Sequence, residues 1–125
     1  MTTPSRTPAD LLDPAGVVIH LDEDGPGKQE GVLRNTTNLL EEVAAGTAIE
    51  LVAHGPGMSI LLAGSEHADT VRSLHTRGVG FVACANTMAR MGVERDQLHE
   101  AASIASSGLA QLVRRQQQGW VYLRP

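Results

Sequence analysis

The sequence predicts a three-layer α/β/α sandwich built on a mostly parallel sheet of about five strands. Two observations support this class. Short apolar runs alternate with longer stretches of helical periodicity, and each apolar run is nearly continuous instead of alternating with polar residues. A strand that is apolar on both sides is typical of a parallel sheet covered by helices on both faces. The 125 residues are enough for one such core but not for two.

The first part of the chain predicts a lead-in, a strand and a helix. Residues 1–15 carry three prolines and several Ser and Thr residues, and we interpret them as a flexible lead-in to a single domain over 16–125. The apolar run VVIHLD, 17–22, predicts the first strand. Apolar residues then recur at helical spacing over 28–46, where Gly46 occupies a position that suits a helix C-terminus.

The middle of the chain repeats this alternation. A second strand is predicted over 48–53, closed by a Gly-Pro-Gly turn, and two helical pieces follow over 58–64 and 66–78. The run VGFVAC, 79–84, predicts the third strand, and ANTMARMG, 85–92, predicts a short helix directly after it.

The last third completes the sheet. Residues 94–101 predict a loop or a single helical turn, and 102–106 a weak fourth strand. A helix is predicted over 108–119 and a final strand over 120–125. The apolar face of that last helix comprises Leu109, Leu112 and Val113.

Composition excludes several classes of function. The net charge is −4 and aromatic residues make up 2% of the chain, so it offers neither a basic stripe for phosphates nor stacking platforms for bases. We therefore expect no nucleic-acid partner. The N-terminus lacks the apolar core of a signal peptide, and no apolar run approaches the roughly 20 residues of a membrane span. A cytoplasmic location is the resulting expectation, and a single cysteine fits a reducing compartment.

Candidate site residues follow three of the predicted strands. Asp22, with Glu23 and Asp24 behind it, ends the first strand, His54 ends the second, and Cys84 ends the third. Ligands of open parallel sheets gather outside the carboxyl ends of the strands. We therefore expect these residues to lie on one edge of the sheet.

Cys84 has the clearest chemical case. Asn86 or Thr87 can cap the helix that begins after it, and the unpaired N–H groups of that helix would stabilise a thiolate. Such a thiol has a lowered pKa and reacts readily with iodoacetamide at neutral pH. Free cysteines also pack as core residues, and the spacing alone favours neither interpretation. His54 is either a residue that orients or deprotonates the thiol or a solvent-exposed turn residue.

The sequence predicts no metal and no organic cofactor. The histidines show no paired spacing along the chain, and CxxC and HExxH are absent. The segment DEDGPGK lies between a strand and a helix but has neither phosphate-binding fingerprint, and its carboxylates would repel a phosphate. We interpret it as a solvated acidic loop.

Four segments, taken in order, resemble the DsrE/DsrF-like sulfur-relay family, whose YchN-type members are small single domains. They are VVIHLDED, IELVAHGPG, GVGFVACANTMARMGV and GLAQLVRRQQQGWVYLRP, and the resemblance spans about residues 16–125. It implies a Rossmann-like domain and assembly into homo-oligomers, trimers or hexamers. In relay members a cysteine after a central strand accepts sulfur as a persulfide and passes it on. By position Cys84 resembles that residue.

The resulting hypothesis is a sulfur carrier, or sulfurtransferase-like protein, that relays sulfur on Cys84 between donor and acceptor proteins. His54, Asn86, Thr87 and Asp22 are its candidate supporting or pocket residues. The alternative is a non-enzymatic oligomeric protein that binds a small ligand or a partner at the same sheet edge. A nucleotide-binding regulator is a third reading, supported only by the strand, glycine loop and helix outline.

Overall fold

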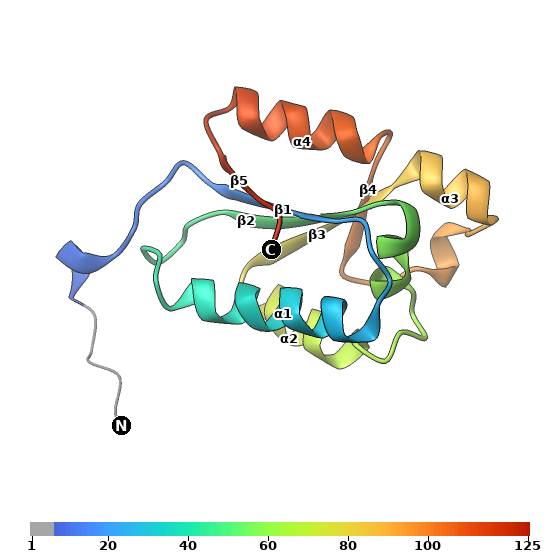
Figure 1. Ribbon diagram of the computed structural model, residues 1–125, viewed down its shortest axis with the longest axis horizontal. Helices are drawn as coiled ribbons and strands as arrows, with labels where there is room; N and C mark the ends of the chain where they lie inside the picture. The colour runs from blue at the N-terminus through green and yellow to red at the C-terminus, as the bar shows by residue number, and fades with distance from the viewer. Residues whose placement is uncertain (1–6) are drawn as a thin grey trace.

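The computed structural model describes residues 7–125 and contains one five-stranded sheet (Figure 1). Every neighbouring pair of strands is parallel, and the strand order is β4-β3-β2-β1-β5. The predicted α/β class and its parallel sheet are confirmed. The strands are β1 (Val17–Leu21), β2 (Ile49–Ala53), β3 (Val79–Cys84), β4 (Ala102–Ala105) and β5 (Val121–Leu123).

Helices cover both faces of this sheet, which makes the three layers. Figure 1 shows α1 and α2 on one face, α4 on the other, and α3 beyond the carboxyl ends of the strands. Within the described residues, each helix is too short or too polar to cross a membrane. The helices are α1 (Pro26–Leu40), α2 (Ala68–Thr76), α3 (Ala85–Met91) and α4 (Gly108–Gln117), with 3-10 turns η1 (Pro8–Asp10), η2 (Gly55–Leu61) and η3 (Arg95–Gln97).

The two faces of the sheet carry unequal cores. All residues of β1 and β2 are buried, as their near-continuous apolar runs predict. The larger cluster packs between the sheet and the α1–α2 layer, with Ile19, Leu51 and Phe81 at its centre. The smaller cluster lies under α4 and joins its Leu112 to three valines, Val18, Val52 and Val82.

The first predicted helix ends earlier than its periodicity indicates. It stops at Leu40 instead of continuing to Gly46, and Gly46 adopts a φ of 83° in a later turn. The reason is a tertiary contact that the sequence does not reveal. Leu12 pairs with Val43 as an isolated parallel bridge, so the chain after Leu40 must leave the helix to meet it.

The predicted lead-in is partly bonded to the domain. Residues 1–6 lie outside the described residues. Leu12 donates its N–H to the Glu42 carbonyl at 2.9 Å and accepts from the Ala44 N–H at 2.7 Å. The chain is therefore attached to the domain from Leu12 onward, ahead of the predicted boundary at residue 16.

The last helix turns a different face to the sheet than predicted. Leu112 is buried, but Leu109 and Val113 are 60% and 54% exposed. The inward face instead presents Gln111 and Arg115 to Glu50 on β2. Glu50 is buried between the sheet and α4, and a buried carboxylate needs polar partners. Gln111 and Arg115 supply them, which determines the side of α4 that faces the sheet.

Candidate functional site

The carboxyl edge of the sheet brings the predicted site residues together. Leu21, Ala53 and Ala83 are aligned across β1, β2 and β3, so the residues that follow them emerge side by side. The N–H of His54 further donates to the Leu21 carbonyl at 3.1 Å. The prediction that Asp22, His54 and Cys84 share one edge is confirmed.

The HGPG turn after β2 has a structural purpose. A Cβ atom at Gly57 would lie 2.4 Å from the carbonyl oxygen of Leu21, so only glycine allows η2 to pack against the end of β1. The N–H of Gly55 donates to the hydroxyl of Thr87 at 2.9 Å, which ties the turn to α3. The turn thus locks His54 between β1 and the helix that follows Cys84.

Cys84 lies where β3 passes into α3, and two helices begin beside its sulfur. It is itself the N-cap of α3, so the predicted capping residues Asn86 and Thr87 lie inside the first turn instead. The direct hydrogen bond to Sγ comes from the N–H of Gly108, the first residue of α4, at 3.2 Å. Ser107 caps α4 by accepting from the N–H of Ala110 at 3.1 Å, which fixes where that helix starts.

The environment of Cys84 favours its thiolate. Burial has the largest single influence and raises the pKa of the thiol, because it removes charge from water. The Thr87 hydroxyl and the N–H groups of Thr87, Gly108 and Asn86 oppose burial and together leave the pKa below its ordinary value. Hydrogen-bond donors stabilise the charged sulfur more than the neutral one, which gives the shift its sign.

The same thiol is buried. Cys84 is only 5% exposed, so the chain by itself does not present the open, readily alkylated sulfur expected from the sequence. A hollow of about 310 Å³ lies next to it, bordered by Gly55, Pro56, Thr87, Arg90 and Met91. Thr87 borders this hollow and also hydrogen-bonds to the sulfur, so this residue connects the two.

Gly108 allows three chain segments to meet at this point. A Cβ atom placed on Gly108 would lie 3.1 Å from Cβ of His54 and 3.3 Å from Cβ of Cys84. A side chain at this position would require His54, Cys84 or the start of α4 to move by a few tenths of an ångström. His54 and Cys84 are therefore neighbours across this glycine, and neither the glycine nor its role follows from the spacing of the site residues along the chain.

His54 takes part in a polar chain that crosses to the edge strand. Its Nε2 lies 2.6 Å from Nε2 of His20, and the two rings stack with centroids 4.8 Å apart. The Nδ1 atom of His20 lies 2.7 Å from the hydroxyl of Tyr122 on β5. His54 is half-buried, so the interpretation of it as a solvent-exposed turn residue is wrong.

His20 and Tyr122 are site residues that the sequence analysis missed. The signal for His20 was its polarity at the end of an otherwise apolar strand, VVIHL, since a buried polar side chain needs a partner. Burial, followed by the nearby His54, lowers the pKa of His20. Tyr122 is the only tyrosine of the chain, but its proximity to His20 depends on β5 pairing with β1, which the local pattern does not reveal.

The acidic residues after β1 separate from one another. Asp22 forms an ion pair with Arg124 at 3.1 Å, and ligand atoms of Asp22, His20 and His54 all lie within 4.8 Å of one another. Glu23 lies 3.5 Å from the Lys28 ammonium. Only Asp22 therefore belongs to the cluster at the cysteine edge.

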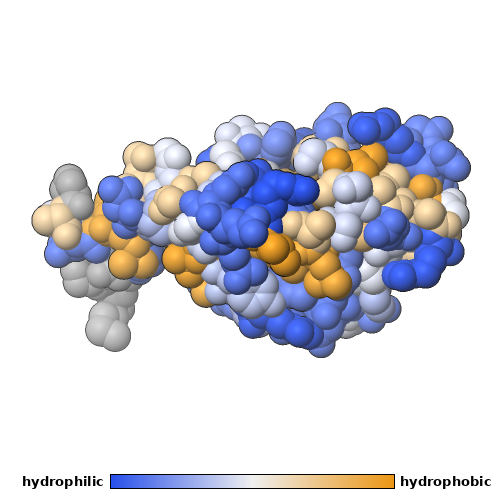
Figure 2. Space-filling view, turned by 90° about the horizontal axis from the view of Figure 1, so that it is seen from above, coloured by the Kyte–Doolittle hydropathy of each residue, from blue (hydrophilic) through white to orange (hydrophobic). Residues whose placement is uncertain are grey.

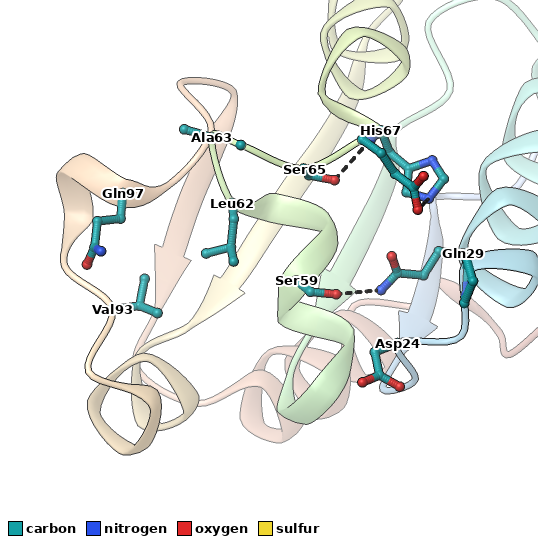
Figure 3. Close-up of a pocket in the computed structure, with 12 residues that line it drawn as sticks. Asp24, Gln29, Ser59, Leu62, Ala63, Ser65, His67, Val93 and Gln97 are labelled. Atoms are coloured by element: carbon teal, nitrogen blue, oxygen red, sulfur yellow. Dashed lines mark hydrogen bonds and ion pairs between the residues drawn. The ribbon is translucent and has the colours of Figure 1, made fainter.

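A larger hollow lies on the other side of the edge. It encloses about 720 Å³, and Figure 3 shows Asp24, Gln29, Ser59 and His67 around it. The Gln29 amide spans part of its wall, donating to the Ser59 hydroxyl and to the Glu23 carbonyl, both at 3.0 Å. This hollow is lined by the start of α1, by η2 and the segment 62–67 after it, and by Val93 and Gln97, and its lining does not include Cys84.

The fold and the site together define a class: a small parallel α/β protein with one cysteine at the carboxyl edge of its sheet, hydrogen-bonded by the start of a helix. The model of the DsrE/DsrF-like family matches residues 16–125, and the chain belongs to that family. A comparison with functionally curated proteins finds no match.

Solved structures agree with this assignment. The chain is 37% identical to MTH1491, a protein of unknown function from Methanobacterium thermoautotrophicum, with a TM-score of 0.84 over 91% of this chain and 99% of that one. It shares the fold of the ychN protein from E. coli at 16% identity, with a TM-score of 0.75 over 88% of this chain and 98% of that one. BT1422 from Bacteroides thetaiotaomicron, a conserved protein of unknown function, is 10% identical with a TM-score of 0.53 over 89% and 95%.

Proposed function

We propose that this protein is a sulfur carrier that holds sulfur as a persulfide on Cys84 and transfers it between partner proteins. The observation that supports this most directly is the set of donors around Sγ, with the Gly108 N–H at 3.2 Å. A thiol kept only as core filler would need no such donors. Membership of a family associated with sulfur relay is consistent with the same chemistry. A cytoplasmic site of action is part of this proposal.

The transfer consists of two exchanges at sulfur. The Cys84 thiolate attacks the outer sulfur of a donor persulfide, forms Cys84–S–SH and releases the donor thiolate. An acceptor thiolate then attacks the outer sulfur of Cys84–S–SH, becomes a persulfide and restores the Cys84 thiolate. Each step breaks one S–S bond and forms another, so no external oxidant or reductant is required.

Burial of the thiol gives the carrier a second property. A persulfide on the buried Cys84 is protected from small thiols in solution, and the hollow that Thr87 borders is where a partner would approach it. Transfer then requires a partner that reaches this hollow or that loosens the start of α4. We propose that Arg90, on the rim of the hollow, attracts the thiolate of such a partner.

A mass measurement tests the proposal. The native protein is incubated with a protein persulfide donor, and we expect a gain of one sulfur atom that maps to Cys84 and is removed by dithiothreitol once the chain is unfolded. The Cys84→Ser variant must stay unmodified. If the native protein gains no sulfur while a small unfolded peptide with the same cysteine does, the carrier function is wrong, and the edge serves instead to bind a ligand or partner without sulfur chemistry.

We further propose that the protein acts as a homo-oligomer, a trimer or a hexamer. Figure 2 looks onto the α4 side of the molecule and shows hydrophobic side chains between the polar ones. Leu109 and Val113 on α4 and Val121 and Leu123 on β5 are at least 37% exposed in the single chain. Apolar side chains of this size are stabilised when a second surface covers them. Sedimentation at micromolar concentration tests this, and a single 13.2 kDa species would contradict it.

A further inference from the structure

We propose that His20, Asp22 and His54 form a binding site for a divalent transition-metal ion of the zinc class. The three side chains come from the ends of two neighbouring strands and place their ligand atoms within 4.8 Å of one another. Two imidazoles and one carboxylate are a ligand set that suits Zn²⁺ and its first-row neighbours.

The contact between the two imidazoles is favourable only with a proton or a metal ion between their nitrogen atoms. The Nε2 atoms of His20 and His54 are 2.6 Å apart, a separation at which two nitrogen lone pairs repel each other. One proton can lie between them and make a hydrogen bond. A metal ion that accepts both lone pairs meets the same requirement and replaces the proton.

The surroundings of His20 orient it as a metal ligand. Its Nδ1 atom lies 2.7 Å from the Tyr122 hydroxyl oxygen. In the Nδ1–H tautomer the ring donates to that oxygen, and the Nε2 lone pair is directed at His54. Metal-bound histidines characteristically donate their other ring N–H to an oxygen in this way. His20 is 7% exposed and held within β1, so its ring has little freedom to turn elsewhere.

Asp22 can bind a metal without breaking its ion pair. Arg124 contacts Oδ1 of the carboxylate at 3.1 Å, which leaves Oδ2 available as a ligand. The guanidinium then orients the carboxylate while competing for its charge. Three protein ligands leave at least one coordination position open for water or another ligand.

Metal entry requires a small adjustment. Zn–N bonds of about 2.0–2.1 Å at a tetrahedral angle separate two nitrogen ligands by roughly 3.3 Å, more than the present 2.6 Å. His54 is half-buried and lies in the turn after β2, so a rotation of its side chain opens this distance while β1 and β2 stay in place.

Calorimetric titration of the full, tag-free protein with Zn²⁺, after treatment with a chelator, tests the site. We expect one ion per chain, and a Co²⁺ absorption spectrum typical of nitrogen and oxygen ligands. His54→Gln and Asp22→Asn should each weaken Zn²⁺ binding by at least about 100-fold, since even loss of a residue that only supports a ligand costs 10–100-fold. Tyr122→Phe should weaken it by roughly 10-fold. His75→Gln, at an exposed histidine outside the cluster, should bind as the unmodified chain does.

Three results would overturn the site, two of them from the Zn²⁺ titrations. One is the absence of stoichiometric Zn²⁺ binding by a chain that circular dichroism shows to be folded. The other is Zn²⁺ affinity that His54→Gln and Asp22→Asn leave unchanged. The Cys84→Ser variant separates this inference from the carrier function, because it should keep Zn²⁺ binding while losing persulfide loading. A thiolate-to-cobalt band in the unmodified protein, lost in Cys84→Ser together with the binding, would make Cys84 a ligand and refute the three-residue site.

Discussion

The backbone N–H of Gly108 donates to Sγ of Cys84 across 3.2 Å and joins the start of α4 to the end of β3. The two residues are 24 positions apart in the sequence. Their contact is tight, since a Cβ atom on residue 108 would press on both Cys84 and His54. The state of the thiol thus depends on the position of a helix that follows a different strand.

Gly108→Ala should change both the pKa of Cys84 and the free energy of unfolding. The added methyl group lies 3.1–3.3 Å from Cβ of His54 and Cys84, so we expect α4 to shift and the hydrogen bond to lengthen. The pKa of Cys84 should rise relative to that of the unmodified chain, as measured by the pH dependence of alkylation. Overpacking at a tight contact costs about 1 kcal/mol or more in the free energy of unfolding.

Gly31→Ala is the matched control. It lies within α1, where an added Cβ has only the far end of Arg34 near it, at 3.6 Å. Alanine is a better helix former than glycine by roughly 0.5–1 kcal/mol, so this variant should be more stable and should keep the pKa of Cys84. An unchanged pKa of Cys84 in Gly108→Ala would show that the Gly108 N–H contributes little.

The lowered pKa of Cys84 also predicts how stability varies with pH. In the unfolded chain the thiol has a pKa of about 8.5, and in the folded chain its pKa lies lower, so the folded state releases the proton first. The stabilisation is fully present above the unfolded pKa and is lost as the pH falls through the folded pKa. The difference in unfolding free energy between the unmodified protein and Cys84→Ser should therefore increase as the pH rises through the folded pKa of Cys84, and level off above the unfolded pKa of about 8.5.

Thr87→Val tests the cause of that shift. It removes the hydroxyl, which contributes the largest pKa-lowering influence on Cys84, and should flatten the pH dependence. Thr37→Val serves as control, since its hydroxyl bonds only the Leu33 carbonyl in its own helix at 2.9 Å. A pH dependence in Thr87→Val as steep as in the unmodified protein would assign the shift to the backbone N–H groups alone.

Much of the fold could be predicted from local pattern, because β1, β2 and β3 are apolar on both faces and bounded by turns. The run 79–84 matches β3 residue for residue. The errors have one cause: a partner far away in the sequence decided the outcome. Val43 left its predicted helix to pair with Leu12, and α4 rotated to bring Gln111 and Arg115 to Glu50.

The candidate site could be predicted only in part, for the same reason. Asp22, His54 and Cys84 each lie at or directly after the end of a parallel strand, and this correctly predicted that they share one edge of the sheet. The contact between His20 and Tyr122 was not predicted, because it exists only when β5 pairs with β1. That pairing depends on the order of the strands in the sheet, which local sequence patterns do not reveal. Histidine spacing along the chain likewise could not reveal a cluster of His20 and His54, which are 34 residues apart.

The polar contact beneath α4 should be important for stability. Arg115 donates to both carboxylate oxygens of Glu50, at 3.1 and 2.8 Å, and its guanidinium lies 4.3 Å from the ring centroid of Trp120. Arg115→Leu would leave the carboxylate of Glu50 inside the sheet with only Gln111 as its partner. Breaking a buried pair costs about 3–5 kcal/mol, and because Arg115 is partly exposed we expect about 2 kcal/mol, measured by urea unfolding.

Arg72→Leu is the comparison for that measurement. Arg72 also makes two ion pairs, with Asp69 and Glu100, each at 3.0 Å, but on the exposed side of α2. Water screens such pairs, so their loss should change the urea midpoint little. Equal effects in the two variants would mean that the position of Glu50 inside the sheet has no special energetic consequence.

The exposed apolar pair of α4 provides the last prediction. Leu109 and Val113 are four residues apart and lie on one side of the helix, 60% and 54% exposed. If they are covered in the proposed homo-oligomer, Val113→Glu places a charge in an apolar contact and should shift the assembly toward the 13.2 kDa chain in sedimentation. Gln118→Glu adds the same charge at the exposed C-cap of α4, five residues from Val113 and off the side that Leu109 and Val113 share, and should leave the assembly intact. An unchanged sedimentation profile for Val113→Glu would show that this face of α4 stays in water, and the subunit contacts would have to be sought elsewhere on the chain.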